Sequence, residues 1–394
     1  MTQKFSLSQM AYVFVPLVVV VVIAFGVFGI PFTDAQSDED TCGAGRIARG
    51  WDSTDFCNTS INLDEVLSGG VGRDGIPAVT NPDMETVDEA RDWLVDRSPV
   101  IAFEIDGEAR AYPQAILMWH EIANDVVAGV PVAVTFCPLC NSSIVFDRRV
   151  NGETLEFGVS GNLRNSDMIM YDRTTFSWWQ QFVGEGIVGF YNETLLDIIP
   201  SQVVGFGAFA ERYPDGLVMS RDTGTRRSYG INPYTGLDSN RSGVTSLFRG
   251  EYDERLPSRS RVLAGVVDDI PMAYPLEALV NDIVINDTIG TVPVVAMWQS
   301  GVASSLDESD IDTSRDIGTS ALYSRDVDGR VLTFRYDEVN QVIVDAETGS
   351  IWNLFGESIQ GELEGTQLEQ IVATAHFWFA WAAFYPETEI YDIE

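Results

Sequence analysis

Two cysteines with two residues between them are the side chains of this sequence most able to do chemistry. Cys137 and Cys140 lie in the apolar stretch VTFCPLC. A pair at this spacing can be a redox dithiol, part of a metal site or a structural disulfide. Of the two histidines in the chain, His376 lies in the aromatic run ATAHFWFAW, which is typical of a core histidine. His120 is therefore the candidate partner of the cysteines.

These three side chains fit three roles. In a redox dithiol, Cys137 is the nucleophile, His120 lowers its pKa, and Cys140 resolves the mixed disulfide. In a metal site, two thiolates and an imidazole suit Zn or Cu, with Asp167, Met170 or a water as the fourth ligand. In a structural role, a disulfide staples the turn. The sequence leaves these roles open, and with them the identity of any cofactor.

An internal repeat separates residues found in both copies from residues found in one. Residues 111–136 align without a gap on residues 273–298. The alignment replaces the three candidate residues together, by Asp282, Gln299 and Val302. The residues that persist are interpreted as architecture: Tyr112, Asn124, Asp125, Asp172, Trp179 and Phe182, matched by Tyr274, Asn286, Asp287, Asp345, Trp352 and Phe355. Chemistry is therefore expected in the first copy alone.

A second feature of the first copy is the stretch GVSGNLRNSDMIMYDR, part of which has no counterpart in the second copy. Ser160, Asn162, Arg164 and Asp167 are polar groups that a pocket uses to hold the oxygens of a ligand. A longer surface loop with turn-forming Gly, Asn and Ser is the alternative interpretation. The four residues are kept as candidates for ligand binding.

The local patterns predict a mainly β fold with a minor α component. VIAFEIDGEARAYP is typical of two strands joined by an Asp-Gly turn, and PQAILMWHEI of a short helix. The cysteine pair precedes a strand-like run, NSSIVFDRRV, whereas the thioredoxin arrangement needs a helix there. No nucleotide cofactor is expected, because no glycine-rich motif or P-loop leads from a strand into a helix. We expect two tandem homologous antiparallel β lobes with short helices.

The expected organisation has five parts. They are a membrane anchor or signal segment (1–35), an extension with Cys42 and Cys57 (36–98), lobe 1 (99–222), a connector (223–260) and lobe 2 (261–394). The apolar residues 11–30 carry no charge and are long enough to cross a bilayer as a helix. Flanking charges place the bulk of the chain outside the cell, although a signal peptide cleaved near Ala35 competes with an uncleaved anchor.

The expected location outside the cell and the net charge indicate how two cysteines pair, which partners are excluded and in what medium the protein works. In an oxidising compartment Cys42 and Cys57 are expected to form a local disulfide. The net charge is −35 and Lys4 is the only lysine, so nucleic acid is not an expected partner. A surface this acidic and poor in lysine is typical of a protein that stays soluble in concentrated salt. We therefore expect a halophilic source.

Several motifs occur together in order: VLSGGVGRDGIPAV, ARAYP, VTFCPLC, MYDRTTFSWW and RRSYGINPYTGLD. In these motifs and their order the chain resembles domain-of-unknown-function family 3179. Its acidic composition resembles that of a haloarchaeal member. The resemblance implies an extracytoplasmic or anchored protein without an established activity. Two hypotheses remain: a membrane-anchored oxidoreductase or metalloenzyme, whose redox partner or small-molecule ligand is unknown, and a non-catalytic surface module with structural cysteines.

Overall fold

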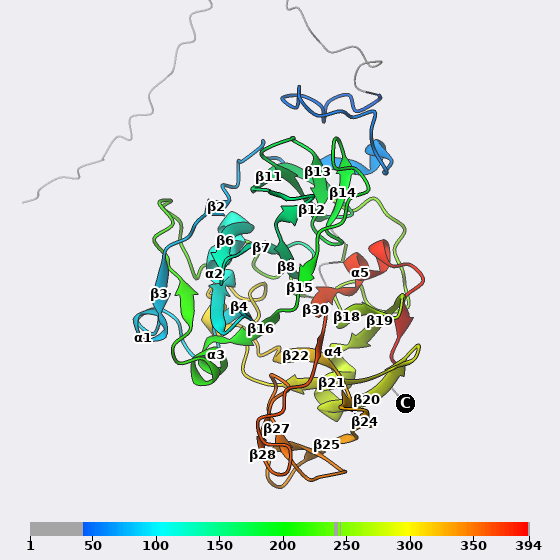
Figure 1. Cartoon of the computed structure of the whole chain (residues 1–394). Coiled ribbons are helices and arrows are strands. Elements are labelled where there is room, and N and C mark those ends of the chain that lie inside the picture. Colours follow the sequence, from blue (N-terminus) through cyan, green and yellow to red (C-terminus); the bar gives the residue numbers. More distant parts are fainter. Residues whose placement is uncertain (1–41, 240–242, 245, 393–394) are drawn as a thin grey trace, which may run out of the picture. The chain divides into compact units, whose positions relative to one another are not determined.

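The computed structural model describes residues 42–239, 243–244 and 246–392 (Figure 1). The described residues belong to one compact unit and are mainly β, as the sequence predicted. The proposed membrane segment, residues 11–30, lies outside the described residues. Among the residues that are described, no helix is long and apolar enough to span a membrane.

The first half begins with the predicted strand, turn and strand. β4 (Pro99–Ile105) and β5 (Glu108–Pro113) are antiparallel, and Asp106 and Gly107 join them with φ of 48° and 85°. Positive φ at both central residues is what a two-residue hairpin turn of type I′ requires. The predicted helix follows as α2 (Gln114–His120), whose buried face packs on these strands.

Three sheets make up the described first half. One contains, in strand order, β1 (Val66–Ser68), β11 (Phe157–Arg164), β12 (Asp167–Asp172), β13 (Trp178–Gln180) and β14 (Glu185–Val188). The next contains β15 (Ile198–Ile199), β8 (Ser142–Asp147), β7 (Val130–Cys137), β6 (Ile122–Val127) and β2 (Val79–Thr80). The last contains β16 (Gln202–Gly205), β4, β5, β17 (Leu217–Met219) and β3 (Met84–Thr86). The remaining elements are the hairpin β9 (Arg149–Val150) and β10 (Glu153–Thr154), and the helices η1 (Leu63–Glu65), α1 (Val87–Ala90) and α3 (Phe206–Arg212).

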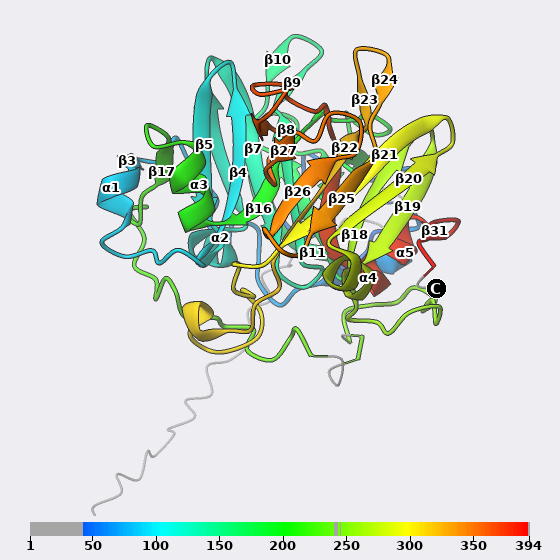
Figure 2. The same ribbon diagram turned by 90° about the horizontal axis from the view of Figure 1, so that it is seen from below.

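The second half repeats this order of elements. Its sheets are β30 (Ala373–Phe377), β18 (Arg261–Val267), β19 (Ile270–Pro275) and β31 (Glu389–Ile390); β20 (Val284–Ile289), β21 (Val292–Gln299), β22 (Thr319–Ser324) and β29 (Gln370–Ile371); and β25 (Phe334–Asp337), β26 (Val342–Asp345), β27 (Ile351–Trp352) and β28 (Ser358–Gln360). The remaining elements are β23 (Asp326–Val327), β24 (Arg330–Val331), α4 (Leu276–Asp282), η2 (Ile311–Thr313) and α5 (Trp378–Phe384). The hairpins β9–β10 and β23–β24 lie on the same side in Figure 2.

Residues at matching positions make the same hydrogen bonds in the two halves. In each half a tyrosine hydroxyl donates to a strand aspartate, and a tryptophan N–H donates to a turn aspartate. The pairs are Tyr112 with Asp125 at 2.6 Å, Tyr274 with Asp287 at 2.9 Å, Trp179 with Asp172 at 3.2 Å and Trp352 with Asp345 at 2.9 Å. The matched side chains therefore have the same hydrogen-bond partners in both halves.

The two halves share contacts and part of a core. β30 lies against β8, and β16 lies against β22, so each half places a strand beside the other (Figure 1). Aromatic residues of α5 are buried in the same cluster as Cys137 and Cys140. The environment of the cysteines is therefore built by both halves.

The extension before the first half is tied to it. β1 pairs with β11, β2 with β6, and β3 with β17. Cys42 and Cys57 form the predicted disulfide. Between them Trp51 packs edge-on against the buried Trp178, with ring centroids 5.2 Å apart. Residues 42–98 are thus part of the first half's sheets and core.

Candidate functional site

The two free cysteines lie at the end of a β-hairpin. β7 ends at Cys137, β8 begins at Ser142, and the two residues face each other in the antiparallel register. Between them Asn141 takes a φ of 51°, and its N–H donates to the carbonyl of Pro138 at 3.2 Å. A strand therefore follows the cysteine pair, as the sequence predicted, and the thioredoxin arrangement is absent from this site.

Residues from distant parts of the chain hold this turn in place. The N–H of Phe377 donates to the carbonyl of Cys140 at 3.0 Å, and the side-chain amide of Asn141 donates to Ala375 at 3.1 Å. The guanidinium of Arg259 donates to the carbonyl of Leu139 at 3.0 Å. Strand β30 and the connector thus cover the turn, and both thiols are buried, at 1% and 0% exposure.

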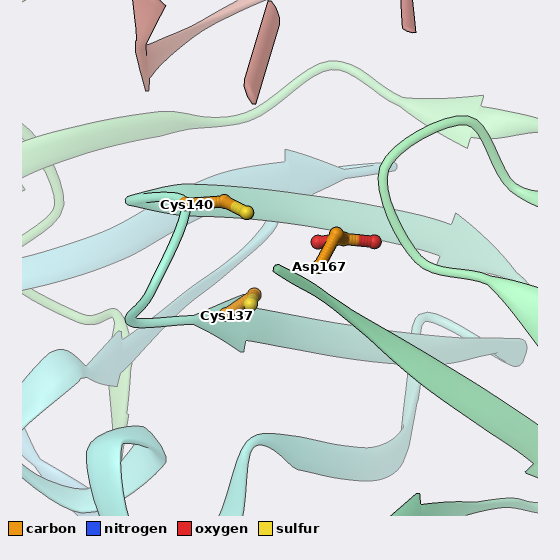
Figure 3. Close-up of side chains that lie close together, drawn as sticks. All are labelled: Cys137, Cys140 and Asp167. Atoms are coloured by element: carbon orange, nitrogen blue, oxygen red, sulfur yellow. The ribbon is translucent and has the colours of Figure 1, made fainter. Parts of the chain in front are cut away.

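Asp167 completes a group with the cysteines. Figure 3 shows its carboxylate beside both sulfurs, with one oxygen pointing between them. The ligand atoms of Cys137, Cys140 and Asp167 all lie within 4.8 Å of one another. The end of β7, the turn after it and the start of β12 therefore bring three side chains together inside the protein.

Only one of the two carboxylate oxygens of Asp167 accepts hydrogen bonds of normal geometry. Its Oδ2 accepts hydrogen bonds from the side chain of Gln180 at 2.7 Å and from the N–H of Phe182 at 3.0 Å. Its Oδ1 is buried and has no hydrogen bond of normal geometry among the described residues, although the thiol of Cys137 lies beside it. Burial raises the pKa of Asp167 to about 7. A buried carboxylate oxygen without a full hydrogen bond is costly, and a cation bound beside it would offset that cost.

The pKa values of both thiols are shifted away from those of reactive cysteines. Burial raises the pKa of Cys137, and burial together with the neighbouring Cys137 raises the pKa of Cys140 well above its usual value. Reactive cysteines show the opposite shift, because a nearby cation favours the thiolate. Arg259 is close enough to Cys140 to oppose the shift, but it does not reverse it. A bound cation at the centre of the group is what would stabilise both thiolates.

Glu121 is a buried glutamate whose backbone bonds to the strand that ends at Cys137, and the sequence interpretation did not consider it. It follows α2 with a φ of 60°, and its carbonyl accepts the N–H of Phe136, the residue before Cys137. Burial and the charge of Asp167 raise the pKa of this glutamate to about 8. The internal alignment places Glu121 on Ile283, which has a φ of 64°. The test that selected the cysteines would therefore have selected Glu121 as well.

His120 has partners of its own. Its Nδ1 lies 2.7 Å from the carbonyl oxygen of Pro77, and its Nε2 lies 2.7 Å from the hydroxyl of Tyr229. Burial lowers the pKa of His120. The structure does not place this imidazole in the group formed by the cysteines and Asp167. Through Tyr229, His120 connects the C-terminal end of α2 to the connector.

The other ligand-binding candidates, Ser160, Asn162 and Arg164, make hydrogen bonds or ion pairs away from the cysteines. Ser160 donates to the carbonyl of Ile169 at 2.6 Å and accepts from the N–H of Asn162 at 3.0 Å. Arg164 pairs with Glu65 at 2.7 Å. These residues lie in β11 at an irregularity of its pairing with β12, where a loop was the alternative interpretation. Of the four ligand-binding candidates, only Asp167 joins the cysteines.

Met170 and His376 are core residues near the site. Met170 is buried in β12 and, three residues along the strand from Asp167, is expected on the opposite face. His376 lies 2.7 Å from the hydroxyl of Thr374, and its ring is 4.5 Å from that of Phe182. Burial lowers the pKa of His376 to about 3, so it is a neutral core histidine.

A family model described as a protein of unknown function, DUF3179, matches residues 73–388. The match spans both halves and includes the two cysteines, Asp167 and Glu121. Searches of curated proteins and of solved structures gave no match. The site must therefore be interpreted from its own geometry.

Proposed function

Because the chain belongs to the DUF3179 family, whose function is unknown, we propose a function from the site alone: the first half is a metal-binding module. Cys137, Cys140 and Asp167 are its ligands. The observation that carries the proposal is the unpaired, buried Oδ1 of Asp167 beside two free thiols. A cation at this point would satisfy the oxygen and both sulfurs together.

Zn²⁺ is the ion that this ligand set suits best. Two thiolates favour Zn²⁺ or Cu⁺, whereas a carboxylate is a hard ligand that suits Zn²⁺ better than Cu⁺. The centre has no redox-active group besides the thiols. Binding of Zn²⁺ would release the protons that the raised pKa values of Cys137 and Asp167 retain in the metal-free protein.

The experiment is a metal analysis of the full chain purified under reducing conditions in high salt. We expect one Zn²⁺ per chain, removable by a chelator and restored on readdition, with Cu⁺ in its place only when copper is supplied in excess. A chain that binds neither ion under reducing conditions, with both thiols verified as free, would overturn the proposal.

A thiol oxidoreductase is the second candidate, supported by the two adjacent sulfurs that form no disulfide. Burial and raised pKa values of both thiols count against it, because an attacking thiol must reach its substrate as the thiolate. Alkylation of the metal-free, folded protein distinguishes the candidates. Rapid modification of Cys137 at neutral pH favours the oxidoreductase, and protection favours the metal centre.

We further propose that the two halves are tandem homologous lobes in an anchored, extracytoplasmic and halophilic protein. The recurring element order and the matched hydrogen bonds support the duplication, and the −35 charge supports adaptation to salt. The alternative is a non-catalytic surface module with inert cysteines. Stability that rises between 0.1 M and 2 M salt would support the halophilic origin, and membrane fractionation of the full chain would test the anchor.

A further inference from the structure

A cleft with a volume of about 400 Å³ lies beside helix α4 in the second half. The walls of this α4 cleft come mainly from the connector, from α4 and from residues 315–317 before β22. Three arginines line it, Arg259, Arg261 and Arg315. A volume of this size is typical of a small-molecule site. In a chain with a net charge of −35, three arginines at one cleft are a local concentration of positive charge.

Arg259 is held rigidly at this cleft. It is 2% exposed, and its guanidinium carbon lies 5.0 Å and 4.8 Å from the ring centroids of Phe377 and Phe379. Its Nε donates to the carbonyl of Gly243 at 2.9 Å, and its Nη1 donates to that of Leu139 at 3.0 Å. Among the described residues its Nη2 has no hydrogen bond, and no carboxylate forms an ion pair with it. A buried arginine is normally paired with an anion, so a partner for Arg259 is expected.

The carboxylates near the cleft are paired or exposed to solvent. Asp238 is buried and forms ion pairs with the two other arginines, at 3.0 Å and 2.7 Å. Asp316 accepts N–H groups from its own segment of chain, and Glu277 is exposed. The charge of Arg259 is therefore the one without a close partner. A ligand with one negative charge would balance it, whereas a dianion would also meet these carboxylates at close range.

The first half shows that the fold does not require this arrangement. Arg97 lies two residues before β4, as Arg259 lies two residues before β18. In both halves the carbonyls on either side of this arginine accept N–H groups from the segment that leads into α3 or α5. The rings that flank Arg259 are replaced there by Gly205 and Gly207, and Arg97 is partly exposed. Both halves therefore have the arginine, but only the second half encloses it between two rings.

We propose that the α4 cleft binds a small organic monocarboxylate, with the carboxylate on Arg259 and the apolar body of the molecule against Leu256, Leu276, Val280 and Ile317. A guanidinium stacked on aromatic rings keeps its N–H edge in a fixed direction, which suits a planar carboxylate. The apolar wall adds affinity for the rest of the molecule. The second half thus has a ligand site of its own, and this inference does not depend on the metal centre.

The test compares hexanoate with hexanamide, its neutral counterpart of nearly the same shape, on the full chain at constant molar salt. Titrations followed by ligand-detected NMR measure the two dissociation constants. We expect hexanoate to bind about tenfold more tightly, the range of a hydrogen bond between charged groups. Formate has the charge without the apolar body. It should bind more weakly than hexanoate, because each buried CH₂ group adds affinity.

Matched variants locate the site. R259Q should remove the preference for hexanoate over hexanamide, and R97Q, at the matching position of the first half, should leave it unchanged. Because Arg259 also bonds to Leu139, thermal unfolding checks that R259Q is folded. V280W is a second route, since Val280 is 43% exposed on α4 and a larger side chain there fills the apolar part of the cleft. It should weaken hexanoate and leave formate unaltered.

Four outcomes would contradict the proposal. Equal affinity for hexanoate and hexanamide in the unaltered protein would overturn it. Equal losses in R97Q and R259Q would place the binding elsewhere. Inorganic phosphate that binds more tightly than hexanoate would exclude a monocarboxylate as the ligand class. If R259Q does not fold, V280W decides, and an unchanged affinity for hexanoate in that variant would exclude the α4 cleft as the binding site.

Discussion

The connection between one pair of matched strands differs between the two halves. In the first half, residues 138–141 join β7 to β8, and Cys140 of this turn is buried beside Cys137 at the end of β7. In the second half, residues 300–318 join β21 to β22. The strand ends keep the same register, since Cys137 faces Ser142 and Gln299 faces Thr319. One position in the scaffold therefore carries a short buried turn in one half and a long connection in the other.

The long connection has a task of its own. The N–H of Ala303 donates to the carbonyl of Arg97 at 2.9 Å, and the hydroxyl of Ser98 donates to Asp312 at 2.6 Å. Residues 300–318 thus fasten the second half to the first. The comparison indicates that the hairpin end tolerates large changes when the strands are kept. The short form occurs where two sulfurs lie beside a carboxylate.

The largest expected effect is the loss of metal from the short turn. C137S should weaken Zn²⁺ binding by at least about a hundredfold, because loss of a ligand costs at least as much as loss of the groups that orient ligands. Q299S makes the same change at the matching position of the second half and should leave the affinity unaltered. Competition with a chromophoric chelator measures both. Equal losses in the two variants would remove the distinction between the halves.

The next effect concerns the carboxylate. D167N should weaken Zn²⁺ binding by about ten- to a hundredfold, because a neutral amide oxygen replaces a charged ligand while Gln180 and Phe182 still surround it. The offset that aligns Asp172 with Asp345 places Asp167 on Asn340, which is exposed. N340D should therefore create no second site. A second bound Zn²⁺ in N340D would show that the second half retains more of the centre than its side chains indicate.

The metal-free protein should lose stability as the pH rises from about 4 to about 8. The folded-state pKa values of Asp167 and Glu121 are about 7 and about 8, raised by burial above unfolded values of about 4. Over this range the folded state binds more protons than the unfolded state, so the free energy of unfolding falls as the pH rises. Thermal unfolding at fixed high salt measures the slope.

A double variant separates these two groups from the acidic surface. D167N combined with E121Q should show a shallower decline, because the surface carboxylates remain and the two buried ones do not. Bound Zn²⁺ should also flatten the curve, since it favours the ionised form of Asp167. An identical slope in the double variant and the unaltered protein would contradict burial of these two carboxyl groups.

Local features of the fold could be predicted because local chemistry decides them. The Asp106 and Gly107 turn, the helix after it and the strand after the cysteines all depend on neighbouring residues. The disulfide between Cys42 and Cys57 followed from their proximity in the sequence. The shared core and the β30 strand over the turn depend on contacts between distant segments, which the sequence pattern does not encode.

The site could be predicted in part, for a similar reason. The cysteines stood out because the residue type is rare and the repeat lost both. Asp167 was named only as one of several polar candidates. His120 was grouped with the cysteines, but its ring nitrogens bond to Pro77 and Tyr229. Glu121 was missed although the repeat replaces it by Ile283, because glutamate is common in an acidic chain and its burial is not visible in the sequence.

The smallest expected effect comes from Asp316, which lies in the long connection of the second half. The carboxylate of Asp316 accepts hydrogen bonds from the N–H groups of Gly301, Val302 and Gly318, at 2.9–3.0 Å, 3.1 Å and 2.8 Å. It is exposed, so D316A should lower the free energy of unfolding by only about 1 kcal/mol. Denaturant unfolding at constant salt measures this change, and D316N should recover part of it.

In D316A the Zn²⁺ affinity should stay constant, because a carboxylate closes the long connection while, in our proposal, a metal closes the short turn. A coupled loss of affinity would mean that the long connection supports the metal centre through the first half, and the two turns would then form one unit.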